Sequence, residues 1–184
     1  IVGITLPSDG AHVLYIWLQD TLGRSNPAST GTTTLFLDRM PPSPPSGLQG
    51  IPARTWTNVN NFSEMWINPP DPSGITGAYY RLDRPGNTPT DGVYVPSSQG
   101  LTGLVVPGDG KHDLYLWLVD GAGNVSHLNR NVDPQVFWYD GTFPTSTAAV
   151  SPAPSATGWY SSTVAVSFSG SDPLVSPTIP ASGL

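Results

Sequence analysis

The sequence predicts an all-β fold of tandem β-sandwich units, one of them complete and two partial. Three observations predict this class: abundant proline and glycine, an internal repeat of about 100 residues, and short runs of alternating apolar residues. The 184 residues include 21 Pro and 20 Gly, the poorest helix formers, spread along the whole chain. Six Trp, seven Tyr and five Phe argue against disorder, because disordered chains lack large apolar side chains.

The internal repeat is visible without any gap at its strongest block. Residues 1–24 align with 101–124 at an offset of 100, and eleven of the 24 positions are identical. A second block follows at an offset of 102, where 35–38 align with 137–140. A period of about 100 residues is too long for a solenoid repeat and fits one small β-sandwich.

A weaker match extends the repeat to the end of the chain. It sets two tryptophans of the complete unit, Trp56 and Trp66, against Trp159 and Phe168, and each pair leads to an Asp-Pro. The phase of the repeat then gives four segments. These are the C-terminal half of a unit (1–40), a Pro-rich linker (41–45), a complete unit (46–140) and the N-terminal part of a further unit (141–184). We expect the chain to be a window of a longer tandem array.

Seven strands are predicted in the complete unit, each ended by a turn signal or a proline that cannot continue a ladder. Which of Trp66 and Ile67 faces the core is left open, because both are apolar. The predicted strands are 48–51, 62–67, 78–83, 92–95 (a short edge strand), 101–106, 112–120 and 135–139.

The segment 112–120 shows the clearest alternation. Its even-numbered residues, from His112 to Asp120, include three leucines and are expected to face the core. Its odd-numbered residues include Tyr115 and Trp117, which are therefore expected on the outer face of the sheet. Residues 12–20 repeat both rows one unit earlier.

Residues 104–124 combine Pro-Gly-Asp-Gly, alternating aliphatics and Val-Asp-Gly-Ala-Gly-Asn. This segment resembles the sixth-strand region of bacterial extracellular fibronectin type III-like and immunoglobulin-like repeats. Residues 66–83 resemble their second-to-third-strand region. The sequence departs from the family where His112 and His12 replace the usual corner tyrosine. The resemblance implies a sandwich fold and says little about function.

An outer aromatic face is the candidate binding surface. It comprises Tyr15, Trp17, Tyr79, Arg81, Tyr115 and Trp117. Three interpretations remain open: cross-strand packing without a ligand, contact with another chain or module, and stacking against a glycan. The presence of the same stripe in successive repeats favours packing.

Composition and motifs exclude several other functions. The net charge of −6 disfavours a nucleic-acid partner, and the absence of cysteine excludes a thiolate metal site or nucleophile. No apolar run is long enough for a membrane helix. His12 and His112 are repeat-equivalent and thus expected to be structural, with backbone partners, and Glu64 is the sole glutamate. We predict no enzymatic activity, no cofactor and no metal site.

We therefore expect a structural spacer, stalk or filament-forming module of a longer extracellular or cell-surface protein. Its expected partners are other copies or neighbouring modules of the same protein, and a surface glycan is a further candidate. Stiff Pro-rich linkers between sandwiches favour a rod. Two alternatives remain: an accessory carbohydrate-binding module of a secreted protein, and an adhesin repeat that binds calcium at the acidic turns 71–74, 109–110 and 120–124.

Overall fold

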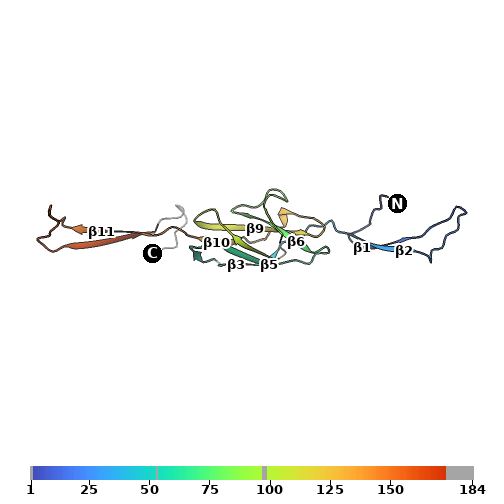
Figure 1. The fold of residues 1–184 in the computed structure, drawn as a ribbon, viewed down its shortest axis with the longest axis horizontal. Coiled ribbons are helices and arrows are strands. Elements are labelled where there is room, and N and C mark those ends of the chain that lie inside the picture. The colour runs from blue at the N-terminus through green and yellow to red at the C-terminus, as the bar shows by residue number, and fades with distance from the viewer. Residues whose placement is uncertain (1, 53, 97–98, 173–184) are drawn as a thin grey trace.

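The computed structural model describes residues 2–52, 54–96 and 99–172, and its regular structure is almost entirely β-strand. The chain is elongated, with a central unit between two narrow two-stranded ribbons (Figure 1). Within the described residues, the helical content is one 3₁₀ turn, His127–Asn129 (η1). The predicted all-β class is therefore confirmed.

The central unit, residues 46–139, consists of two sheets that face each other across one apolar core. The five-stranded sheet has the order β4 (Trp56–Thr57), β10 (Gln135–Tyr139), β9 (Gly110–Asp120), β6 (Ile75–Leu82), β7 (Val93–Val95). The three-stranded sheet has the order β3 (Ser46–Ile51), β5 (Phe62–Ile67), β8 (Gly100–Leu104).

All seven predicted strands of this unit are present, with shifts of a few residues at their ends. The sequence analysis missed β4, which pairs in parallel with β10 through Trp56↔Trp138 and Thr57↔Tyr139. Two residues are too few to show an alternating pattern, and a parallel partner about 80 positions away leaves no local signal.

The core is built from the inward rows of both sheets. The predicted inward row of β9, from His112 to Asp120, is buried throughout. Phe62 of β5 meets Phe137 of β10 across the core, with ring centroids 4.8 Å apart. Trp66 also faces the core whereas Ile67 is exposed, which settles the alternative that the sequence left open.

The two ribbons flank the central unit. The N-terminal ribbon pairs β1 (Gly10–Ile16) with β2 (Gly31–Leu37), and the C-terminal ribbon pairs β11 (Thr145–Ser151) with β12 (Ala165–Ser171). Most of their side chains are exposed on both faces, because no second sheet covers either ribbon in the described chain.

The N-terminal ribbon reproduces the β9–β10 hairpin of the central unit. Gly10 pairs with Leu37 and His12 with Leu35, and the repeat-equivalent pairs in the central unit are Gly110↔Tyr139 and His112↔Phe137. The sequence repeat is therefore also a repeat of strand register.

Candidate functional site

The predicted aromatic face is divided between two parts of the molecule. Tyr79↔Trp117 and Arg81↔Tyr115 are register pairs between β6 and β9, so four of the six residues share the outer face of the five-stranded sheet. The other two lie on or directly after β1, in the N-terminal ribbon, where Tyr15 and Trp17 are exposed.

Trp117 lies on the outer face as predicted but is completely buried, so the expectation that it forms part of an exposed binding surface is wrong. Its ring stacks on Tyr79 with centroids 6.0 Å apart, and its indole Nε1 donates a 2.7 Å hydrogen bond to the Pro89 carbonyl. A Cβ added to Gly86 or Gly92 would come within 2.8 or 2.9 Å of the indole. The connection between β6 and β7 therefore folds over Trp117, and period-two alternation cannot reveal such a cover.

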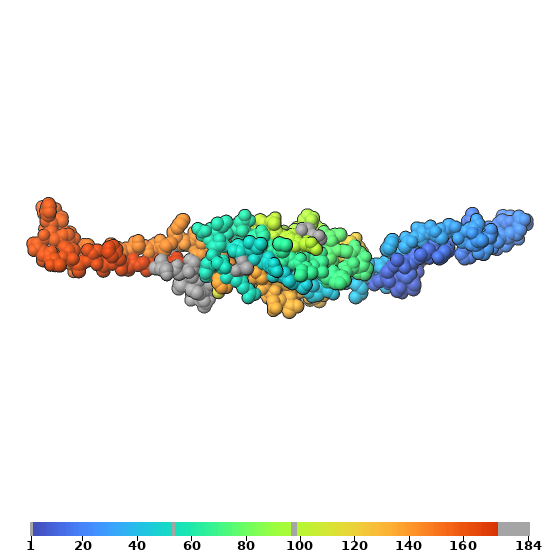
Figure 2. Space-filling view, turned by 90° about the horizontal axis from the view of Figure 1, so that it is seen from below, coloured from blue at the N-terminus to red at the C-terminus, as the bar shows by residue number. Residues whose placement is uncertain are grey.

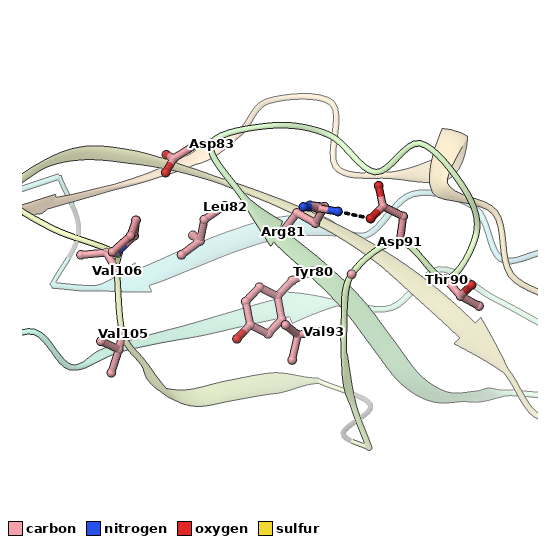
Figure 3. A pocket seen from close by; sticks show the side chains of 11 residues that line it. Tyr80, Arg81, Leu82, Asp83, Thr90, Asp91, Val93, Val105 and Val106 are labelled. Carbon is pink, nitrogen blue, oxygen red and sulfur yellow. Dashed lines mark hydrogen bonds and ion pairs between the residues drawn. The ribbon is translucent and has the colours of Figure 1, made fainter.

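The carboxylate of Asp91 fixes the conformation of the β6–β7 connection. Asp91 forms an ion pair with Arg81 (Figure 3). It forms a second ion pair with Arg84 and accepts the Asn87 amide at 2.9 Å. The Asn87 amide and then the two guanidinium groups hold the pKa of Asp91 below its usual range. Arg81 is therefore engaged in fixing the loop rather than free on the surface.

An open depression of about 730 Å³ lies beside this loop (Figure 3). Its apolar lining includes Tyr80, Leu82, Val93, Val105 and Val106. One tyrosine among aliphatic side chains gives no stacked aromatic platform of the kind that binds sugar rings. The glycan interpretation thus keeps Tyr15 and Trp17 as its main aromatic candidates.

The repeat-equivalent histidines are bonded to turns, as expected. His112 lies between the Gly108 carbonyl (2.8 Å from Nε2) and the Asp83 carboxylate (2.9 Å from Nδ1). His12 makes the same backbone contact with the Ser8 carbonyl at 2.8 Å. These contacts fix the start of each hairpin, and the predicted absence of catalysis stays a prediction.

The linkers that join the central unit to the two ribbons, residues 38–45 and 141–144, are attached to it by side-chain hydrogen bonds. At the first joint, Asn124 Nδ2 donates to the Asp38 carbonyl at 3.1 Å, and Asn129 Nδ2 donates to the Pro42 carbonyl at 2.7 Å. Pro42 and Pro45 are buried, so this Pro-rich segment packs against the unit that follows it.

The second joint uses the turn that precedes β9. Asp109 accepts the Gly141 amide at 2.8 Å and the Thr142 hydroxyl at 2.5 Å. In the N-terminal ribbon the equivalent Asp9 accepts Arg39 Nε at 2.8 Å. An aspartate in the same turn of each repeat therefore contacts the first residues of the linker that follows.

Three carboxylates converge at the first joint, one from the linker and two from turns of the central unit. Single oxygens of Asp38, Asp71 and Asp120 all lie within 4.8 Å of one another. Asp120 is 2% exposed and Asp38 Oδ2 is inaccessible to solvent, whereas hydrogen bonding from Ser73 and from the Met40 amide holds the pKa of Asp38 below its usual range. The sequence singled out the turns that carry Asp71 and Asp120 and missed Asp38, whose approach depends on the joint.

The equivalent of Asp120 in the N-terminal ribbon, Asp20, has a different partner. Arg24 Nε lies 2.7 Å from Asp20 Oδ2, whereas the corresponding Asp120 receives the amide group of Asn124 at 2.8 Å. None of the ion pairs among the described residues reaches the three clustered carboxylates. A positive charge present in one repeat is thus replaced by a neutral amide in the next.

Two further buried polar side chains were missed by the sequence analysis. Asn131 bridges β9 and the segment before β10: it accepts the Leu116 amide at 2.7 Å and donates to the Leu114 carbonyl at 3.0 Å. Glu64 points into the core and is fully buried. The alternation along 62–67 could have indicated that Glu64 is buried, because it places Glu64 on the same face as Phe62 and Trp66.

No family model, curated protein or solved structure matches the chain. The resemblance to fibronectin type III-like and immunoglobulin-like repeats therefore stays a prediction. In the described part of the chain, no helix has both the length and the apolar character needed to cross a membrane.

Proposed function

We propose that the chain is a structural spacer or stalk segment of a longer extracellular or cell-surface protein, built from fibronectin type III-like or immunoglobulin-like units joined end to end. The observation that carries the proposal is the pair of joints. Each linker is attached by side-chain hydrogen bonds to the central unit, and the molecule has a rod-like outline (Figure 2). A chain without fixed joints would bend at its linkers and could not hold a distance.

Small-angle X-ray scattering of the chain in solution tests this proposal. We expect the scattering of a single elongated particle. The variant Asp109→Ala removes both contacts to Gly141 and Thr142, and it should shift the distribution of distances toward bent, shorter shapes. Asp133→Ala is the matched control, since its exposed side chain takes part in none of the hydrogen bonds at the joints. A wild-type chain that scatters as a flexible, collapsed ensemble would contradict the proposal.

Calcium binding at the first joint is a second candidate function, supported by the convergence of Asp38, Asp71 and Asp120. Calcium prefers carboxylate and carbonyl oxygens, and three close carboxylates repel one another until a cation offsets their charge. Asp120 is buried, which strengthens the repulsion because less water screens it. An ion at this position would fix the angle between the N-terminal ribbon and the central unit.

Thermal unfolding with and without calcium tests the second function. At a free calcium concentration about tenfold above Kd, linkage raises the unfolding free energy by about 1.4 kcal/mol, and Tm rises accordingly. The double variant Asp38→Asn with Asp71→Asn should lose the shift, whereas Asp133→Asn should keep it. An equal Tm with calcium and with chelator would remove calcium binding and leave the spacer function in place.

A further inference from the structure

We propose that the central unit pairs side by side with the central unit of a second copy of this chain, through the outer face of its three-stranded sheet. The inference goes beyond the proposed spacer function, because it names a partner and the surface that binds it. This face belongs to the complete unit, and both ribbons lie beyond the ends of that unit (Figure 1).

The outer face of the three-stranded sheet carries an exposed apolar patch. In β5 the even-numbered side chains point into the core, so Met65 and Ile67 point outward, and they are 56% and 63% exposed. Ile51 of the neighbouring β3 is 60% exposed and pairs with Ser63, which also points outward. We call Ile51, Met65 and Ile67 the apolar patch.

The same face carries no charge. Within β3, β5 and β8 the one ionisable side chain is Glu64, and it points into the core. The outer face of the five-stranded sheet differs, since it carries Arg81, Lys111 and Asp113. Because the net charge is −6, two copies repel each other wherever their acidic groups meet. The three-stranded sheet is thus the face of the sandwich where two copies can touch without removing an ion from water.

Glycines beside the patch permit a close approach. Gly100 of β8 lies opposite Met65, and a Cβ added to the exposed Gly103 would meet no atom within 4 Å. On the other side, Ile67 lies across Gly47, where an added Cβ would be 2.9 Å from its Cδ1 atom. A raised row of apolar side chains therefore stands beside a low row of glycines. In a twofold pair the raised row of each copy enters the low row of the other.

The fold of these strands does not require apolar side chains on the outside. The C-terminal ribbon repeats the β3–β5 register at offsets of 100 and 102. The corresponding residues are Gly50 and Val150, Ile51 and Ser151, Glu64 and Val166, Met65 and Ser167, Ile67 and Ser169. All three positions of the apolar patch are serine in the ribbon. The same strand pair thus forms with hydroxyl groups outside, and the patch is a property of the central unit.

The size of the face sets the strength of the contact. Three strands about 4.8 Å apart, each about six residues long at about 3.3 Å per residue, cover about 300 Å². A standard stable interface buries about 800 Å² on each partner. We therefore expect a reversible pair, favoured where spacers stand beside one another and the local concentration is high.

Site-specific crosslinking tests the proposal. The chain has no cysteine, so Met65→Cys introduces a unique thiol at the middle of the patch. A bis-maleimide about 10 Å long, the spacing of two packed sheets, should convert this variant to a crosslinked dimer. Val132→Cys is the matched control, because it places one thiol on an exposed loop of the same unit and should not crosslink above background.

Sedimentation velocity supplies a second measurement without a crosslinker. The mass of the wild-type chain should rise with concentration from 19.4 kDa toward twice that value. The double variant Met65→Ser with Ile67→Ser carries the residues that the ribbon has at these positions, and it should stay monomeric with unchanged thermal unfolding. Val93→Ser with Val105→Ser removes two similarly exposed side chains from the depression beside the β6–β7 loop and should leave the association unchanged.

A mass that stays at 19.4 kDa, with equal crosslinking of Met65→Cys and Val132→Cys, would overturn the proposal. A rise in mass that persists in the double variant Met65→Ser with Ile67→Ser would also overturn it, because the contact would then lie elsewhere on the chain. Neither result bears on the spacer function, since scattering at low concentration measures the rod shape of the single molecule.

Discussion

The N-terminal ribbon and the β9–β10 hairpin of the central unit have related sequences and the same register, yet their side chains experience different surroundings. Leu118 is 2% exposed and its equivalent Leu18 is 85% exposed, and Trp117 is fully buried whereas Trp17 is 49% exposed. The hairpin and its turn are thus encoded locally. The burial is contributed by strands and a loop far away in the chain.

Replacing Trp117 and its equivalent Trp17 should give the largest difference in the free energy of unfolding between the two regions. Trp117→Ala removes a fully buried ring and its hydrogen bond to Pro89, and we expect a loss of about 3–5 kcal/mol in the free energy of unfolding. Trp17→Ala should change it by less than about 0.5 kcal/mol, because the ring is half exposed on the ribbon. Urea unfolding followed by far-UV circular dichroism measures both.

A milder variant, Trp117→Phe, remains measurable even where Trp117→Ala does not fold. This variant keeps an aromatic ring under the loop but loses the indole donor, so its free energy of unfolding should lie between those of the wild type and the alanine variant. Equal losses for Trp117→Ala and Trp17→Ala would show that the β6–β7 loop does not cover the sheet in solution.

The next contrast concerns Glu64 and its ribbon equivalent, Val166. Burial raises the pKa of Glu64 from 4.5 to about 7, although the backbone amides of Gln49 and Met65 oppose the shift. The folded chain then binds more protons than the unfolded chain between these two values. The contribution of Glu64 to the free energy of unfolding is therefore greatest below about pH 4.5, and it falls by about 3 kcal/mol as the pH rises through 7.

Glu64→Gln isolates this pH dependence, since it keeps the shape of the side chain and cannot ionise. We expect its unfolding free energy to lose the decline between pH 4.5 and 7, and to exceed that of the wild type at about pH 8. Urea titrations across this range provide the measurement. Identical slopes for the two proteins would mean that Glu64 reaches water in the folded state.

A smaller contrast compares two asparagines in the connections that follow the equivalent strands. Asn131→Ala leaves the buried Leu116 amide and Leu114 carbonyl without their side-chain partners, which should cost about 1–3 kcal/mol. Asn26 accepts the Ala28 amide at an exposed site, so Asn26→Ala should cost less than about 0.5 kcal/mol. Thermal unfolding compares the variants, and equal costs would show that Asn131 is solvated.

The strands of the central unit could be predicted from the sequence because each has a local signal. Alternation defined 112–120, and proline or glycine defined the ends of the other six. The inward row of β9 followed from the same period. The burial of Trp117 could not be predicted, since alternation assigns a side chain to a face and cannot tell what lies above that face.

The candidate sites depended even more on long-range contacts. Asp38 joins Asp71 and Asp120 only because the linker bends back onto the turns of the next unit. Asn131 acquires its role from the ladder of β9, fifteen residues earlier. Neither contact has a signature of spacing or residue type. By contrast, the backbone bonds of His12 and His112 were predictable, because two copies of one turn make them.

Every edge strand of the central unit is short or irregular, and this limits where a strand of another molecule can pair with its two sheets. The five-stranded sheet ends at β4, with two residues, and at β7, with three. In the three-stranded sheet, β3 and β8 each pair with β5 through a shifted register. Long, regular edges are the ones that recruit foreign strands. The central units of many such molecules can therefore lie side by side at high density without their sheets fusing sideways.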